Sequence, residues 1–381
     1  MKEKVAIIDA LGAHGSSHHF YLFGQLKGLK RNGVDVRLYT NSKTEDPRID
    51  GVGFYQSFGN LFSSEIKVVR GLKYILGSVV SALHARFNGV GVFHFHVFHI
   101  NLLMLFNIIF VKLMLGKAVL TIHDVTSFTS MRYSSILRKL SYKLSNLILT
   151  HNKFSKEEII KIAPFVKDNI FIVHHGNYTP FINIRKDRIQ SRVHLNLPKD
   201  KTILLFFGMI KKEKGLEILL HSFRQIVDTN PNVFLLIAGK PWKNNFGNYQ
   251  KIINKHNLAK NIILHIKFIP NEDVEYYYCA SDLVVLPYKK IYQSGVLMMA
   301  LSYGKPVLAS DLAPLKEVII DNETGFLFKS GDVNDLVKKV NIIFSDKENI
   351  ERVRKNGNKL INKKFSWDMI GRLIKKAYQT L

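Results

Sequence analysis

The sequence predicts an α/β protein with two domains, each built on a parallel β-sheet. Its 381 residues, of which 46% are hydrophobic, are enough to bury two sizeable cores. Short apolar runs alternate with longer segments of helical periodicity in both halves of the chain. Because a strand, a helix and a second strand in succession form a right-handed parallel unit, this alternation favours doubly wound sheets.

The first half opens with such a unit. Residues 5–8 predict a buried strand, the loop 11–17 follows, and a helix with an apolar face ends at Asn32-Gly33. The second strand is expected at 36–39. The loop holds two glycines, too few for the G-x-G-x-x-G sequence that binds dinucleotides, so the pattern predicts no dinucleotide cofactor.

A basic and then an apolar segment follow. Residues 61–90 predict one or two basic amphipathic helices, and 101–115 is almost wholly apolar. A membrane-spanning helix needs about 20 apolar residues without a central charge, whereas this segment is shorter and contains Lys112. We therefore expect a core helix, with a lipid-touching face as the alternative. Together the two segments favour attachment to the surface of an anionic membrane.

Histidines lie at the ends of predicted strands. His123 ends the strand that begins at residue 118, on the side of a parallel sheet where ligands bind. His94 and His96 share one face of another strand and His99 follows it. Zinc is the minor interpretation of these three, because no carboxylate or cysteine joins them. His174 and His175 are assigned mainly to packing at a hinge.

The second half repeats the alternation. Residues 1–180 are assigned to an N-terminal domain, the polar segment 181–200 to a linker, 201–365 to a C-terminal domain and 366–381 to a final helix. Within 291–310, a polar loop, an apolar helix and a buried strand follow one another. Such a unit points the unpaired N–H groups of a helix N-terminus at an anion beyond the strand ends.

These segments carry a family resemblance. The runs FFGMIKKEKGLEILLHSF, LLIAGK and SDLVVLPYKKIYQSGVLMMALSYGKPVLASDLAPLKEVIIDNETGFLF, then FSW, resemble the nucleotide-sugar-binding domain of family-4 glycosyltransferases of the GT-B fold. The resemblance spans about residues 200–370, and LTIHD and IVHHGN are weaker matches in the first half. It implies two Rossmann-like domains that face each other across a cleft, with the last helix crossing back to the N-terminal domain. QSGVLMMAL resembles bacterial exopolysaccharide and O-antigen transferases.

The resemblance implies a donor site in the second domain. The segment from Gly208 to Lys214-Gly215 matches the family's G-R-x-x-x-x-K-G, whose cations neutralise the diphosphate, but Met209 replaces the arginine. Lys211 is therefore expected to supply the missing charge beside Lys214. Ser294 and Gly295 match the loop that offers N–H groups to the phosphates. The expected donor-binding set is Gly208, Phe268, Ile269, Gln293, Ser294, Gly295, Val296 and Glu317, with capping of the next helix an equal role for Glu317.

The resemblance also implies roles in the first domain. His123 matches the family's active-site histidine near the anomeric carbon, and we group it with Lys214 and Lys211 as catalytic. The acceptor-side loop is expected to include Gly12, His14, Gly15 and His18. If the enzyme inverts, a general base is needed, for which His123, Asp124, His14 and His18 all stay candidates.

Two departures qualify this interpretation. The family's Glu-x7-Glu falls at Ile291 and Met299, so both carboxylates are missing and the stereochemistry stays open. No D-x-D sequence occurs in a loop after a strand, so neither a metal nor another cofactor is expected.

The charge pattern bears on the partners. Residues 1–180 carry 22 Lys and Arg against 11 Asp and Glu, and the remainder carries 33 against 19, so the net charge of +25 is not a basic tail. The single cysteine, Cys279, fits a reducing compartment.

The predicted function is the transfer of a hexose from a UDP- or GDP-linked sugar to a lipid-linked or oligosaccharide acceptor in cell-surface polysaccharide synthesis. We expect a cytoplasmic protein, peripheral on the inner face of the cell membrane. The alternative is a nucleotide-sugar epimerase or a non-catalytic GT-B relative. A basic nucleic-acid-binding protein is more remote, because no P-loop or aromatic-and-basic strand motif occurs.

Overall fold

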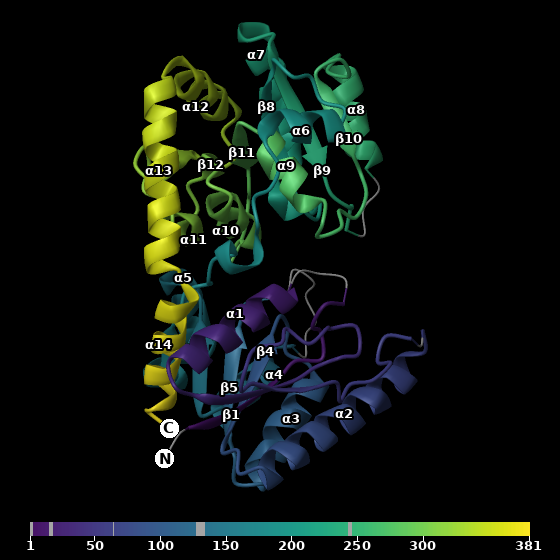
Figure 1. Cartoon of the computed structure of the whole chain (residues 1–381), viewed down its shortest axis with the longest axis vertical. Coiled ribbons are helices and arrows are strands. Elements are labelled where there is room, and N and C mark those ends of the chain that lie inside the picture. Colours follow the sequence, from purple (N-terminus) through teal and green to yellow (C-terminus); the bar gives the residue numbers. More distant parts are fainter. Residues whose placement is uncertain (1–2, 15–17, 64, 127–133, 243–245) are drawn as a thin grey trace. The chain divides into compact units, whose positions relative to one another are not determined.

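The computed structural model describes residues 3–14, 18–63, 65–126, 134–242 and 246–381 and divides the chain into two compact units (Figure 1). Unit 1 comprises Met1–Gly176 and Phe365–Leu381, and unit 2 comprises Asn177–Lys364. Within the described residues, each unit contains one sheet whose strand pairs are all parallel. This confirms the predicted α/β class with two doubly wound domains.

Unit 1 is organised around a sheet with the strand order β3-β2-β1-β4-β5-β6-β7. Its elements are β1 (Lys4–Ile8), α1 (His18–Arg31), β2 (Asp35–Tyr39), β3 (Gly53–Tyr55), α2 (Lys67–Phe87), β4 (Val92–Val97), α3 (Leu102–Leu113), β5 (Lys117–Ile122), α4 (Ser134–Leu144), β6 (Leu147–Thr150), α5 (Lys153–Ile162), the 3-10 helix η1 (Pro164–Asn169), β7 (Ile170–Ile172) and α14 (Trp367–Tyr378).

Unit 2 has the strand order β10-β9-β8-β11-β12-β13. Its elements are the 3-10 helix η2 (Thr179–Phe181), α6 (Arg188–His194), β8 (Thr202–Phe207), the 3-10 helix η3 (Lys212–Lys214), α7 (Leu216–Thr229), β9 (Val233–Ala238), α8 (Gly247–Lys255), β10 (Ile262–His265), α9 (Val274–Ala280), β11 (Leu283–Leu286), α10 (Gly295–Ser302), β12 (Val307–Ser310), α11 (Ala313–Lys316), β13 (Phe326–Phe328), α12 (Val333–Ser345) and α13 (Lys347–Lys364).

The central strands are mostly apolar and buried, because helices cover both faces of a parallel sheet. In β6 and β11, for example, every residue is buried. The strand order reverses once in each sheet, between β1 and β4 in unit 1 and between β8 and β11 in unit 2. Ligands of doubly wound sheets bind beyond the carboxyl ends of the strands at such switch points. The fold therefore points to one candidate site in each unit.

The predicted linker is folded into unit 2. Within residues 181–200, helix α6 starts at a capping box formed by Asp187 and Gln190. Arg192 is fully buried, donates to the carbonyl oxygens of Lys199 and Lys201 and pairs with Asp282. Main-chain carbonyl oxygens of this segment serve the buried arginine, which needs several acceptors. We correct the assignment accordingly.

The C-terminal helix α14 packs beside α1 within unit 1 (Figure 1). Glycines permit the close approach, since a Cβ at Gly28 would lie 2.1 Å from the carbonyl oxygen of Trp367. The ring of Trp367 also lies where a Cβ of Gly24 would be. In the part of the chain that the structure describes, no helix has the length and apolar character needed to cross a membrane.

Candidate functional site

The switch point of unit 2 brings three segments of the predicted donor site together. Gly208 directly follows β8, Lys214 ends η3, and Ser294 precedes helix α10. A Cβ at Gly208 would lie 3.4 Å from Lys214 Nζ and 3.2 Å from a methyl group of Val296 at the start of α10. The Lys214 ammonium thus lies between the end of β8 and the N-terminus of α10.

Lys214 has no acidic partner in the part of the chain that the structure describes. Its Nζ lies 5.3 Å from the ring centre of the buried Tyr288, whose hydroxyl oxygen is 3.5 Å from Ser294 Oγ. The neighbouring Glu217 pairs with Lys289 instead, and among the described residues no carboxylate pairs with Lys214. Burial lowers the pKa of Lys214 to about 8, because desolvation disfavours the charged form. An anionic ligand would restore that charge.

The N-terminus of α10 adds main-chain donors. Ser294 caps the helix, and its Oγ accepts the N–H of Leu297 at 3.1 Å. The N–H groups of Gly295 and Val296 donate to no acceptor among the described residues. Together with the helix dipole, such unpaired N–H groups favour a negatively charged ligand.

Glycine is required at two turns of this site. Gly208 has a φ of +94° and Gly215 a φ of +64°, a region that residues with a Cβ adopt at a cost. A Cβ at Gly215 would also lie 1.9 Å from the carbonyl oxygen of Pro287, directly after β11. Gly215 therefore lets η3, which carries Lys214, approach the end of that strand.

The other predicted donor residues lie in different surroundings. Lys211 Nζ is 5.2 Å from the ring centre of Trp242. The two lysines therefore contact different rings, since Lys214 lies beside Tyr288. Phe268 is exposed and Ile269 is buried, both beyond β10, and Glu317 directly follows α11. Gln293 is partly buried, and its Oε1 has no hydrogen-bond donor among the described residues.

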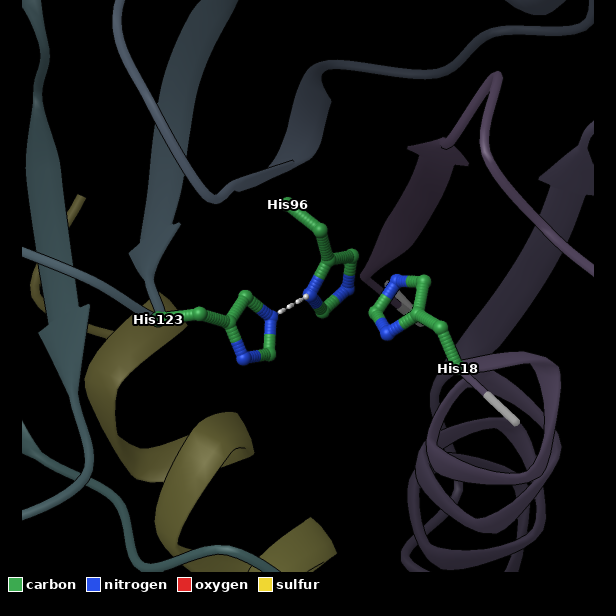
Figure 2. A group of neighbouring side chains, drawn as sticks. All are labelled: His18, His96 and His123. Carbon is green, nitrogen blue, oxygen red and sulfur yellow. Dashed lines mark hydrogen bonds between the residues drawn. The ribbon is translucent and has the colours of Figure 1, made fainter. Parts of the chain in front are cut away.

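The switch point of unit 1 holds a cluster of buried histidines. Asp9 directly follows β1, His96 lies near the end of β4, and His123 and His151 directly follow β5 and β6. His18 comes from the first turn of α1. One nitrogen each of His18, His96 and His123 lie within 4.8 Å of one another (Figure 2).

Short contacts between ring nitrogens link His96, His123 and His151 into a chain. His123 Nε2 is 3.0 Å from His96 Nδ1, the contact drawn in Figure 2, and His123 Nδ1 is 3.0 Å from His151 Nε2. His151 Nδ1 donates to the carbonyl oxygen of Val173, and His96 Nε2 lies 2.8 Å from Gln25 Oε1. Separately, His18 Nε2 lies 3.0 Å from Asp9 Oδ2.

This geometry changes the role assigned to His123. Its side chain is buried, and both ring nitrogens face other histidines. A general base needs a nitrogen within reach of the acceptor hydroxyl, so His123 does not fit that role in this arrangement. Burial, reinforced by the neighbouring histidines, lowers the pKa of His123 and of His96 well below the ordinary value.

The other predicted site residues of unit 1 have contacts of several kinds. Gly12 donates its N–H to Asp9, and His14 stacks on Phe62 at 3.6 Å between ring centroids. Burial, then Lys43 and Arg70, lower the pKa of His14. Asp124 lines a small cavity with His99 and Arg138. Gly15, like Ser16 and Ser17, lies outside the described residues.

The group of histidines whose nitrogens converge shares His96 with the zinc alternative predicted from the sequence, and its other members are His18 and His123. His94 lies on the same strand as His96, but its nitrogens meet Tyr378 and Thr121 at 2.6 Å, and His99 is exposed. The sequence interpretation missed Asp9, Gln25 and His151 as partners of the cluster. The available signal was a polar residue directly after each of several apolar strands, but strand order decides which of them become neighbours.

Comparisons with known proteins agree with this picture. Residues 187–360 match the family described as glycosyl transferases group 1. The chain is 26% identical to a lipopolysaccharide 1,2-N-acetylglucosaminetransferase of Salmonella typhimurium over 57% of this chain and 56% of that protein. It is 24% identical to the capsular polysaccharide biosynthesis glycosyltransferase CapM of Staphylococcus aureus, over 63% and 60% respectively.

A solved structure extends the similarity to the whole fold. The structure of Anabaena Alr3699/HepE in complex with UDP and glucose superposes with a TM-score of 0.76 at 16% identity, covering 100% of both chains. This likeness confirms the fold that the sequence resemblance implies, and the match over residues 187–360 agrees with the implied family, whereas the individual site residues stay predictions.

Proposed function

This chain is a group 1 glycosyltransferase with the GT-B fold, and on that premise we propose that it transfers a hexose from a UDP- or GDP-linked sugar to a lipid-linked or oligosaccharide acceptor. The observation that carries the proposal is the convergence of Lys214, which has no acidic partner among the described residues, with the N-terminus of α10. The relatives named for lipopolysaccharide and capsule synthesis support a role in cell-surface polysaccharide synthesis.

The donor's leaving group explains why these groups converge. When the glycosidic bond breaks, negative charge develops on the departing nucleoside diphosphate. A cation and N–H donors fixed in place stabilise that charge more in the transition state than in the ground state. In this assignment Lys214 and the N–H groups of Gly295 and Val296 hold the diphosphate, and Gly208 leaves room for it.

The donor diphosphate needs no bridging metal in this mechanism. Lys214 and the dipole of α10 provide the positive charge that a divalent cation supplies at other diphosphate sites. Donor binding is therefore expected to be insensitive to EDTA.

Recognition of the sugar must use groups other than the family's two carboxylates. Apolar Ile291 and Met299 occupy those positions. Gln293 lies between them, and its buried Oε1 has no donor among the described residues. We assign this oxygen as an acceptor for a hydroxyl group of the donor, because a buried acceptor without a partner is costly.

A surface of unit 1 supports attachment to an anionic membrane. Helices α2, α3 and α4 contain eight Lys and Arg and no Asp or Glu. Large apolar side chains are exposed on the same helices: Val68, Leu72, Leu76, Phe87, Leu102, Leu113 and Ile136 are each at least 60% accessible. Basic charge beside exposed apolar side chains is the composition of a peripheral membrane surface, and we place this enzyme on the inner face of the cell membrane.

A donor panel tests the assignment. The melting temperature is measured with UDP, GDP and their hexose derivatives, and release of free nucleoside diphosphate is then followed with the donor that binds. One nucleotide series is expected to stabilise the protein, with and without EDTA. If no nucleotide shifts the transition, the donor site is wrong. Conversion of the donor sugar to its epimer without transfer would favour the epimerase alternative.

Liposome flotation tests the membrane surface. The protein is expected to float with vesicles that contain phosphatidylglycerol at low salt and to float less at raised salt. Leu76→Ser on α2 should weaken flotation, whereas the matched control Ile342→Ser, an exposed apolar residue in unit 2, should not. Equal loss in both variants, or flotation with neutral vesicles alone, would contradict the surface.

A further inference from the structure

In the histidine cluster of unit 1, the hydrogen-bond partners leave two facing ring nitrogens without a proton between them. Val173 offers only a carbonyl oxygen, so His151 carries its proton on Nδ1 and, when neutral, accepts at Nε2. His123 must then donate from Nδ1, which leaves a lone pair on His123 Nε2. From the other end, Gln25 Oε1 accepts from His96 Nε2, which leaves a lone pair on His96 Nδ1. These two lone pairs face each other across 3.0 Å.

The orientation of Gln25 that creates this conflict agrees with its second neighbour. Gln25 Nε2 points to His94 Nδ1 at 3.4 Å, and the hydroxyl of Tyr378 lies 2.6 Å from the same nitrogen. His94 then accepts at Nδ1 and donates from Nε2 to Thr121, 2.6 Å away. Each of these groups has a donor opposite an acceptor, so a cation is needed only between His96 and His123.

A third ring faces the same point. His18 donates from Nε2 to Asp9, so in the neutral ring the lone pair lies on Nδ1. All three rings are buried, and Figure 2 shows that they approach one another from different elements. A shared proton is the other cation that these lone pairs could accept, and metal analysis distinguishes a proton from a metal ion.

We propose that His18, His96 and His123 bind one zinc ion, through Nδ1, Nδ1 and Nε2 respectively. Neutral imidazole nitrogens are ordinary zinc ligands, and two of them on a tetrahedral ion lie about 3.3 Å apart, close to the 3.0 Å between His96 and His123. The fourth position is left to solvent or a hydroxyl group. This proposal departs from the expectation of a metal-free chain and is independent of the donor site in unit 2.

The groups around the rings match the requirements of metal-bound histidines. Such a ligand donates its second N–H to a carboxylate, an amide oxygen or another acceptor, which fixes the ring and its tautomer. Here the acceptors are Asp9 for His18, Gln25 for His96 and His151 for His123. The ion would tie the start of α1 to the ends of β4 and β5.

Metal analysis of the full chain, produced without a histidine tag, tests the site. After dialysis against a chelator, the protein is titrated with zinc, and with cobalt(II) as a spectroscopic probe of tetrahedral nitrogen coordination. We expect one ion per chain and a higher melting temperature with zinc. His96→Gln should abolish binding. The matched control His94→Gln removes a buried histidine two residues away on the same strand and should retain one ion.

A second variant keeps the test valid if His96→Gln fails to fold. Asp9→Asn preserves all three ligands and is expected to lower zinc affinity by about 10- to 100-fold. Less than a tenth of an equivalent in the wild-type chain, with no visible cobalt(II) bands, would overturn the proposal and leave a network of hydrogen bonds. Equal loss of zinc in His94→Gln and His96→Gln would overturn it as well.

Discussion

The two switch points of this chain differ in whether their polar groups have protein partners. In unit 1 the polar side chains bond to one another, so that His123, His151 and Asp9 are each held by a neighbour. In unit 2 the polar groups are left without such partners: among the described residues, no carboxylate pairs with Lys214, and the first N–H groups of α10 have no acceptor. The first arrangement stabilises a fixed geometry, and the second favours an anionic ligand.

The two units also differ in which buried groups change charge with pH. Six of the eleven histidines in unit 1 are buried, whereas none of the four in unit 2 is buried. The perturbed base of the donor site is instead a lysine, whose pKa burial lowers to about 8. Acid should therefore act on unit 1 and alkali on the site of unit 2.

The largest expected effect is the acid lability of unit 1. Burial lowers the pKa of His151 to about 4 and of His175 to about 3, whereas the unfolded chain binds these protons near pH 6.5. Stability is therefore fully present above pH 6.5 and is lost as the pH falls toward 4, by on the order of 3 kcal/mol for each histidine. The fluorescence of Trp367 in a Trp242→Phe variant reports unit 1.

Circular dichroism, which reports both units, provides the control for the acid titration. We expect it to change in two steps, with the Trp367 signal following the first. A single step, or a Trp367 signal that persists below the pH at which most helicity is lost, would contradict the difference between the units.

Next in size is the loss of the unpaired cation. Lys214→Ala is expected to lower turnover by about 100-fold or more, because it removes a charge that stabilises the departing diphosphate. Lys212→Ala is the matched control, since Lys212 lies in the same 3-10 helix but is exposed. Steady-state rates of nucleotide release measure both. Similar rates for wild type and a folded Lys214→Ala would remove Lys214 from the mechanism.

The pH dependence of donor binding gives a smaller effect. In the free enzyme Lys214 is charged below about pH 8 and loses its proton above it. Affinity for a nucleoside diphosphate should therefore be constant below pH 8 and fall about tenfold for each pH unit well above it. Calorimetric titrations between pH 7 and 10 check this. In Lys214→Arg the decline should disappear, because arginine keeps its charge; a decline unchanged in that variant would point to another group.

The smallest expected effect concerns the sugar. Gln293→Leu should weaken binding of the nucleotide sugar by about 2- to 10-fold, the usual contribution of one hydrogen bond. The free nucleoside diphosphate should bind equally well to both proteins, because Gln293 is assigned to a hydroxyl of the donor. Equal weakening of both ligands would indicate that Gln293 shapes the loop instead.

The segment assigned to the donor could be predicted from the sequence because its signals are local. The N-cap Ser294, the glycines at positions 208 and 215 and the apolar run of α10 follow from backbone requirements within a few residues. Lys211 shows the limit of local reasoning: the motif resemblance assigns its charge to the diphosphate, and only the structure shows that its ammonium group lies over Trp242. Side-chain direction depends on which neighbours are in reach.

By itself the sequence determined the two α/β domains, because apolar periodicity and turn chemistry are local properties of the chain. Its motifs also carried the family resemblance, from which the segment assigned to the diphosphate follows as a prediction. Only the tertiary structure decided that α6 belongs to unit 2, that α14 packs on α1, and that His18, His96 and His123 converge. The last of these depends on β1 and β5 both lying beside β4. Strand order is a long-range outcome of packing, so residues 78 and 27 positions apart became neighbours without any local signal.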